Sequence, residues 1–164
     1  MPASSFCRVA AVLFFVLVGL ASGLAYLVQT LVLPAADVPL AMAWGLAFGL
    51  VFAAVDHLRT PERYRAMLPD LVPWPDFVIA FTGLCEIAGA VGLLLPPTRL
   101  LAGWMLALYF ACVFPANIRN AVAGLAVDGL PGARLYYWVR LPFQPLIIWW
   151  SLFAGGATGW PFAA

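Results

Sequence analysis

Charged residues are scarce in this sequence. They make up 9% of the chain, whereas 65% of the residues are hydrophobic and the mean hydropathy is +1.01. A soluble domain is nearer half apolar and about a quarter charged. A chain of 164 residues also cannot bury so much apolar surface in a single core. The composition therefore excludes a soluble domain and predicts that the lipid bilayer is the chain's main partner.

Lysine is absent, and all eight basic residues are arginines. The formal net charge is only +1. Proteins that bind nucleic acid through their overall charge present a strongly positive field to the phosphates. We therefore expect no nucleic-acid partner.

Paired cysteines are also missing. The three cysteines, Cys7, Cys85 and Cys112, are scattered and form no Cys-x-x-Cys pair, which is the spacing typical of metal and redox sites. Two of them lie in apolar runs, where a cysteine usually behaves as a small hydrophobic residue. The sequence predicts no metal site and no bound cofactor, and it disfavours thiol redox chemistry.

What the chain does have is long apolar runs separated by short polar or proline-containing segments. A hydrocarbon core of ~30 Å needs about 20 apolar residues per helix, so the chain has room for four or five spans. We predict an all-α integral membrane bundle, with an N-terminal transmembrane helix in residues 1–36 and a four-helix membrane domain in residues 37–164. The five runs are Val9–Leu33, Leu40–Val55, Phe77–Leu95, Leu100 to near Gly124, and a last run after Leu135 that carries Pro142, Gln144 and Pro145 in its first turns.

The first run could also be read as a secretory signal peptide, because Arg8 precedes it and Gly23 to Ala25 offer small residues for cleavage. The apolar core of a signal peptide is usually 7–15 residues long, and this run has about 25. A retained helix, acting as an uncleaved signal anchor, is therefore favoured over a cleaved one.

The arginines indicate an orientation. Five spans would place seven of the eight on the side of the N-terminus and only Arg99 on the other side. The basic side of a membrane protein is normally cytoplasmic. We predict a cytoplasmic N-terminus and a C-terminus outside.

One carboxylate, Glu86, lies near the middle of the third run, about 14 Å deep in a helix that starts near Phe77. Because a charge inside a membrane costs several kcal/mol, and because its helix neighbours include Gly83 and Ala90, Glu86 should face the interior of the bundle. Asn117 and Gln144 lie at similar depth, and His57 and Arg140 lie near the cytoplasmic mouth. These five side chains are predicted to line one polar pocket that opens to the cytoplasm. Asp56 is expected to pair with a neighbouring arginine.

A structural alternative remains open for the same residues. The polar side chains could fasten helices together by hydrogen bonds, with Glu86 protonated or paired with Arg140. Burying a carboxylate in a membrane has a high free-energy cost, and a neutral side chain could join helices equally well. This comparison slightly favours a ligand or proton site over a purely structural role.

From His57 onward the order of residues resembles the DoxX-like family of small bacterial membrane proteins. The resemblance covers roughly Trp44 to Trp150 and adds Tyr64 to the candidate pocket residues. The matching segments, in order, are His57, Pro61, Tyr64, Met67 and Pro69; Pro73-Trp74-Pro75; Thr82 to Ala90 around Glu86; Pro96-Pro97-Thr98-Arg99 with Ala102-Gly103; Phe114-Pro115-Ala116-Asn117-Ile118; and Arg140-Leu141-Pro142-Phe143-Gln144. The N-terminal apolar run is an addition to the four-helix core that the family implies.

The resemblance implies a location in the bacterial inner membrane and a non-catalytic role, as a membrane subunit or assembly partner of a redox or quinone-linked complex. It assigns no catalytic residue and does not decide whether the chain is an enzyme. The alternative is a protein that binds a quinone, an isoprenoid or another lipid-like molecule in the pocket around Glu86. A transporter is disfavoured, because the sequence shows no inverted repeat.

Overall fold

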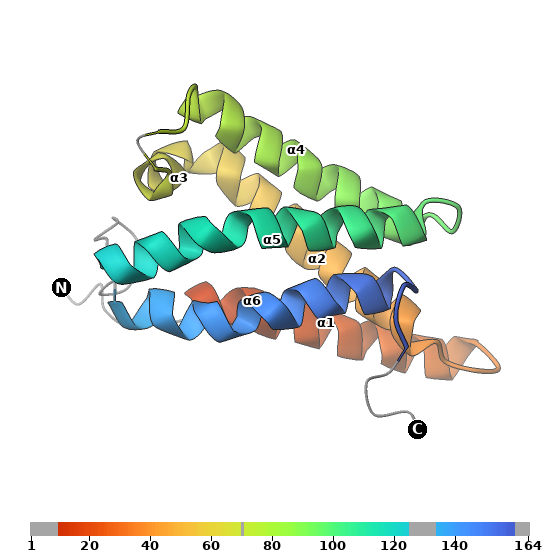
Figure 1. Cartoon of the computed structure of the whole chain (residues 1–164). Coiled ribbons are helices and arrows are strands. Elements are labelled where there is room, and N and C mark those ends of the chain that lie inside the picture. Colours follow the sequence, from red (N-terminus) through yellow and green to blue (C-terminus); the bar gives the residue numbers. More distant parts are fainter. Residues whose placement is uncertain (1–9, 70, 125–133, 160–164) are drawn as a thin grey trace.

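The chain folds into a bundle of helices (Figure 1). The computed structural model describes residues 10–69, 71–124 and 134–159. Over these ranges there are six α-helices and no strands, so the predicted all-α class is confirmed. The helices are α1 (Ala10–Val32), α2 (Val38–Arg59), α3 (Pro61–Met67), α4 (Pro75–Leu94), α5 (Arg99–Ala123) and α6 (Arg134–Ala154).

Four of these helices, α1, α2, α4 and α5, are long and apolar enough to cross a membrane. The fifth long helix, α6, has 21 residues but lies outside this set. It contains two arginines, Arg134 and Arg140, as well as Gln144 and two prolines. Four of the five predicted spans thus have the required length and composition, and the fifth remains a prediction.

Helix boundaries follow local signals in the sequence. Asp37 caps α2, because its Oδ1 accepts a hydrogen bond of 3.0 Å from the backbone N–H of Leu40, which would otherwise lack a partner. Gln29 of α1 accepts a 2.7 Å bond from the Asp37 N–H and so ties the α1–α2 turn to the preceding helix. At the other end of the bundle, Gly124 adopts φ 59° and ends α5, a conformation that favours glycine.

The prediction for the last run was wrong in one respect. Pro142 and Pro145 lie inside α6, which begins upstream at Arg134, and not in its first turns. Proline inside a helix removes a backbone hydrogen bond. Bundles that span membranes tolerate this loss, because neighbouring helices and side chains supply other partners.

Helix α2 is the central element of the bundle. It packs against α1, α4 and α6, while α5 packs against α6 and α4. The apolar core is formed by side chains of α2, α4, α5 and α6, including Leu46, Leu50, Leu93, Leu106 and Ile147. Helix α1 lies at the edge of the bundle against α2 (Figure 1), and most of its large side chains are exposed.

Two helix pairs approach closely at glycines. A Cβ atom on Gly45 of α2 would lie 2.5 Å from the carbonyl oxygen of Val18 and 2.7 Å from the backbone N of Ser22, both on α1. A Cβ on Gly103 of α5 would lie 2.8 Å from Cα of Gly155, just beyond α6. Small residues at such crossings let helix backbones pack closely, as in membrane bundles generally.

The short helix α3 lies in the proline-rich segment between the second and third apolar runs. Pro61 occupies its first turn, where the missing N–H has no helical partner anyway. None of its residues is buried. Because α3 follows α2 after a single residue, Thr60, it is positioned over the end of α2.

Candidate functional site

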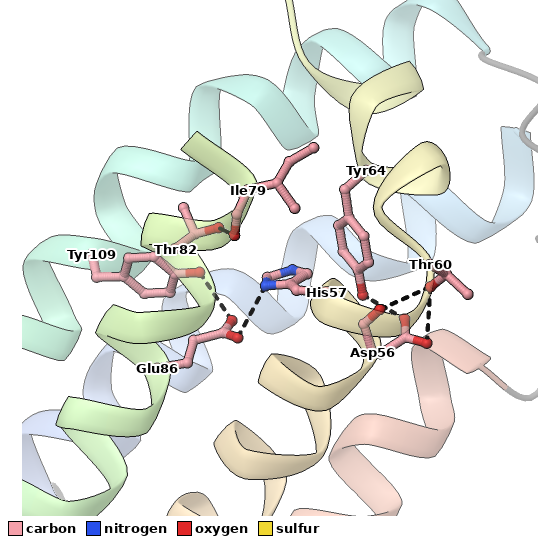
Figure 2. Close-up of polar contacts among 8 residues, drawn as sticks. All are labelled: Asp56, His57, Thr60, Tyr64, Ile79, Thr82, Glu86 and Tyr109. Atoms are coloured by element: carbon pink, nitrogen blue, oxygen red, sulfur yellow. Dashed lines mark hydrogen bonds and ion pairs between the residues drawn. The ribbon is translucent and has the colours of Figure 1, made fainter. Parts of the chain in front are cut away.

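Three polar side chains from three helices, two of them buried and one partly buried, meet in the bundle (Figure 2). His57 comes from the last turn of α2, Glu86 from the middle of α4, and Tyr109 from α5. We refer to them as the His57–Glu86–Tyr109 cluster. Figure 2 shows the Glu86 carboxylate between the phenol of Tyr109 and the imidazole of His57.

The two oxygens of Glu86 have different surroundings. Oε1 accepts a hydrogen bond of 2.9 Å from the hydroxyl of Tyr109. Oε2 lies 3.2 Å from Nδ1 of His57. That distance suits an ion pair, but the contact lacks the alignment of a hydrogen bond, and neither atom has another hydrogen-bond partner. His57 and Glu86 are only 8% and 5% exposed. Glu86 Oε2 and His57 Nδ1 are therefore held close together away from solvent, and each could still form a hydrogen bond.

Tyr64 of α3 covers the outer side of His57. The two rings meet edge to face, with centroids 3.9 Å apart and an interplanar angle of 89°. The Tyr64 hydroxyl donates a 2.6 Å hydrogen bond to Oδ2 of Asp56. Arg63 Nη1 lies 2.9 Å from the same oxygen, which confirms the expected pairing of Asp56 with an arginine. Asp56 thereby fastens α3 to the end of α2.

The surroundings of Tyr64 keep its hydroxyl protonated. Partial burial raises the pKa of the Tyr64 phenol by desolvation, and the hydrogen bond to Asp56 and the negative charges of Asp56 and Glu86 raise it further. The positive charge of Arg140 acts in the opposite direction but is outweighed. Tyr64 therefore remains a hydrogen-bond donor across the physiological pH range, and both Glu86 and Arg140 lie within electrostatic reach of it.

A second polar cluster joins α5 to α6. Asn117 Nδ2 donates a 3.0 Å hydrogen bond to Oε1 of Gln144, and Gln144 Nε2 donates a 2.6 Å bond to the backbone carbonyl of Phe110. Both amides are buried. Asn120, one turn further along α5, is 2% exposed, and its Oδ1 has no hydrogen-bond partner. Phe110 directly follows Tyr109, so adjacent residues of α5 contribute to the two clusters.

The six candidate residues thus fall into separate groups. His57, Tyr64 and Glu86 lie together, and the half-buried Arg140 of α6 lies within electrostatic reach of Tyr64. Asn117 and Gln144 bond to each other. Tyr109 was not predicted from the sequence. Its polar hydroxyl in the middle of an apolar run could have marked it as a candidate partner for Glu86. The sequence analysis also missed Asn120, which lies one helical turn from Asn117.

The described residues contain no group of three or more His, Cys, Asp or Glu side chains that could hold a metal ion. Cys85 and Cys112 are free thiols. The His57–Glu86–Tyr109 cluster offers a carboxylate, an imidazole and a phenol, which can form hydrogen bonds and exchange protons.

The tie between α2 and α3 leads to a first prediction. The Tyr64→Phe variant should lower the free energy of unfolding by about 1 kcal/mol, because it removes one hydrogen bond to a charged acceptor that keeps Arg63 as a partner. Thermal unfolding in detergent measures the change. Tyr26→Phe, at an exposed position on α1, is the matched control. Equal stability of the two variants would show that Tyr64 does not anchor α3.

These features define the class of protein: a helical bundle that has four helices long and apolar enough to cross a membrane and a His–Glu–Tyr cluster whose histidine and glutamate are buried. The chain belongs to a family described as a domain of unknown function (DUF8561), whose model matches residues 46–154. The matched range holds both polar clusters and leaves α1 outside. No curated protein and no solved structure matches the chain.

Proposed function

We propose that this chain is an integral membrane protein that binds a small lipid-like molecule, such as a quinone or an isoprenoid, at the His57–Glu86–Tyr109 cluster. One observation carries the proposal. Glu86 Oε2 and His57 Nδ1 are buried 3.2 Å apart without forming an aligned hydrogen bond. Ionisable groups inside a membrane are costly and usually serve a function, and these two atoms retain the capacity to bind a third polar group.

The competing explanation is that the cluster only fastens α2, α4 and α5 together. Hydrogen bonds between membrane helices do have that effect, at a modest gain each. A structural cluster needs no ligand, whereas a binding site should retain one through mild purification. The two explanations therefore differ in what the purified protein carries.

We expect organic extracts of the purified protein to contain a near-equimolar amount of one amphiphilic compound, detected by mass spectrometry. Glu86→Gln should lose most of it, because a neutral amide makes weaker hydrogen bonds than a carboxylate. Glu62→Gln is the matched control, because the Glu62 side chain is 76% exposed on α3. Extracts that hold only bulk phospholipid, or that are equal for wild type and Glu86→Gln, would overturn the proposal.

For the membrane topology, we propose a location in the bacterial inner membrane, with α6 as a fifth span, the N-terminus in the cytoplasm and the C-terminus outside. The support comes from the arginines. Arg59, Arg63 and Arg65 lie at the α2–α3 end of the bundle, whereas Arg99 begins α5 at the opposite end. This distribution agrees with the preference of arginine for the cytoplasmic side.

A second candidate function is that of a DoxX-like, non-catalytic subunit or assembly partner in a membrane complex, including a redox or quinone-linked one. The observation that favours it concerns α1, which lies outside the family's matched range and leaves most of its apolar side chains exposed. Beside it, an apolar groove of about 400 Å³ runs between α1 and α2. Its lining residues are Leu17, Leu20, Ala21, Leu24, Ala25, Trp44 and Phe48.

This second candidate predicts a stable complex. A photo-crosslinking residue placed at Phe48, in the groove, should join the chain to one integral membrane protein in whole cells, and the same protein should co-purify in equal amount in mild detergent. The control position is Leu46, which is fully buried and should give no crosslink. A chain that crosslinks only to lipid and elutes alone would contradict it.

A further inference from the structure

We infer that the polar group bound at the cluster is a hydroxyl on an uncharged amphiphile, such as an alcohol or a quinol, and not a carbonyl or a charged head group. This inference rests on the proposed binding function and narrows its ligand class. The hydroxyl would donate to Glu86 Oε2 and accept from His57 Nδ1. Three lines of evidence lead to this assignment: the unused donors and acceptors, the local charge balance and the cover over the site.

The first line of evidence is the set of donors and acceptors around Glu86. Tyr109 already donates to Oε1. Thr82, one turn earlier on α4, donates its hydroxyl to the carbonyl of Ile79 at 2.8 Å and is not a partner for Glu86 (Figure 2). Oε2 of an ionised carboxylate can only accept. The facing Nδ1 is therefore assigned the ring proton and acts as a donor.

One unused acceptor therefore lies beside one unused donor. A hydroxyl can satisfy both at once, because it donates one hydrogen bond and accepts others. A carbonyl oxygen could accept from His57 but would leave Oε2 buried without a donor, and an unsatisfied buried polar atom costs about 1–3 kcal/mol. The site therefore prefers an alcohol over the matching ketone, and a quinol over the matching quinone.

The second line of evidence is the balance of charge. Asp56 is paired with Arg63, and the negative charge of Glu86 and the positive charge of Arg140 both act on Tyr64. These four groups are two carboxylates and two guanidinium groups, so their formal charges cancel. A charged head group would add an uncompensated charge inside the bundle, which is strongly unfavourable. An uncharged ligand avoids that cost.

The third line of evidence is the cover over the site. Tyr64 covers His57 from α3, a seven-residue helix with no buried residue. Besides the contact of Tyr64 with His57, α3 is attached to α2 through Asp56 and to α4 through the ion pair of Arg65 with Asp76. Moving Tyr64 would expose the imidazole without disturbing the apolar core formed by α2, α4, α5 and α6. A hydroxyl on a flexible apolar tail could reach the cluster by this route.

The test compares para-dodecylphenol with its methyl ether, which has the same tail but no donor. Purified full-length protein in detergent is titrated with each probe, and native mass spectrometry measures the bound fraction. We expect the phenol to bind at least tenfold more tightly, since the ether leaves Oε2 without a donor. The Glu86→Gln variant should weaken phenol binding about tenfold, while the Glu62→Gln control should bind it as the wild type does.

The outcomes separate this inference from the proposal on which it rests. Equal binding of phenol and ether, lost in Glu86→Gln, would overturn the hydroxyl assignment and leave the binding site intact. Binding of the phenol that is unchanged in Glu86→Gln would overturn the assignment of the site to this carboxylate. Failure of both probes, together with extracts free of any amphiphile other than phospholipid, would overturn the inference and the proposed function together.

Discussion

Replacing His57 with leucine should lower the free energy of unfolding by about 3–5 kcal/mol. The substitution removes the imidazole that lies 3.2 Å from Glu86 Oε2 and leaves one oxygen of a buried carboxylate facing an apolar side chain. Tyr109 remains on the other oxygen but cannot compensate for the lost partner. Thermal and denaturant unfolding of the purified protein in detergent measures the loss.

A set of combined variants distinguishes the loss of an ion-pair partner from a simple packing defect. Replacing both partners with apolar residues of similar volume is often nearly neutral, so His57→Leu with Glu86→Met should recover much of the lost stability. Adding Tyr109→Phe removes the hydroxyl that would then lack an acceptor and should recover more. If His57→Leu alone is as stable as the wild type, the His57–Glu86 contact has no energetic role.

The Gly45→Ala substitution should detach α1 from α2, with a loss of about 3 kcal/mol, at the upper end of the usual cost of overpacking. The new methyl group would lie 2.5 Å from Val18 O and 2.7 Å from Ser22 N. Both are backbone atoms of α1, so no side-chain rotation relieves the overlap. The two helices must move apart, and the apparent melting temperature in detergent should fall.

Gly23→Ala is the matched control, because a Cβ at Gly23 of α1 meets nothing within 4 Å. Alanine favours a helix over glycine by about 1 kcal/mol, so this variant should be as stable as the wild type or slightly more stable. Equal melting temperatures for Gly45→Ala and Gly23→Ala would show that α1 does not pack on α2 as closely as described.

Much of the bundle could be predicted because apolar runs and their ends are local properties. Asp37 and Gly124 mark a helix start and a helix end through their own side chain and backbone. The placement of Pro142 and Pro145 was missed for the opposite reason. Proline is a helix breaker by its local preference, and only the surrounding bundle explains its presence inside α6.

In the candidate site, too, some features follow from the local sequence and others depend on how the helices pack. The burial of Glu86 followed from the cost of a charge in lipid, and its neighbours on α4 could be predicted from helical periodicity. Its partners His57 and Tyr109 depend on how α2 and α5 are rotated about their axes, which depth along each helix does not determine. For this reason Asn117 and Gln144, placed at similar depth, bond to each other in a separate cluster.

The adjacency of Tyr109 and Phe110 has a mechanical consequence. The side chain of the first residue bonds to α4 through Glu86, and the carbonyl of the second bonds to α6 through Gln144. Because the two groups belong to consecutive residues of α5, that helix cannot twist at this level without disturbing both attachments. A displacement of Glu86 on α4 should therefore also shift the hydrogen bond of Gln144 on α6.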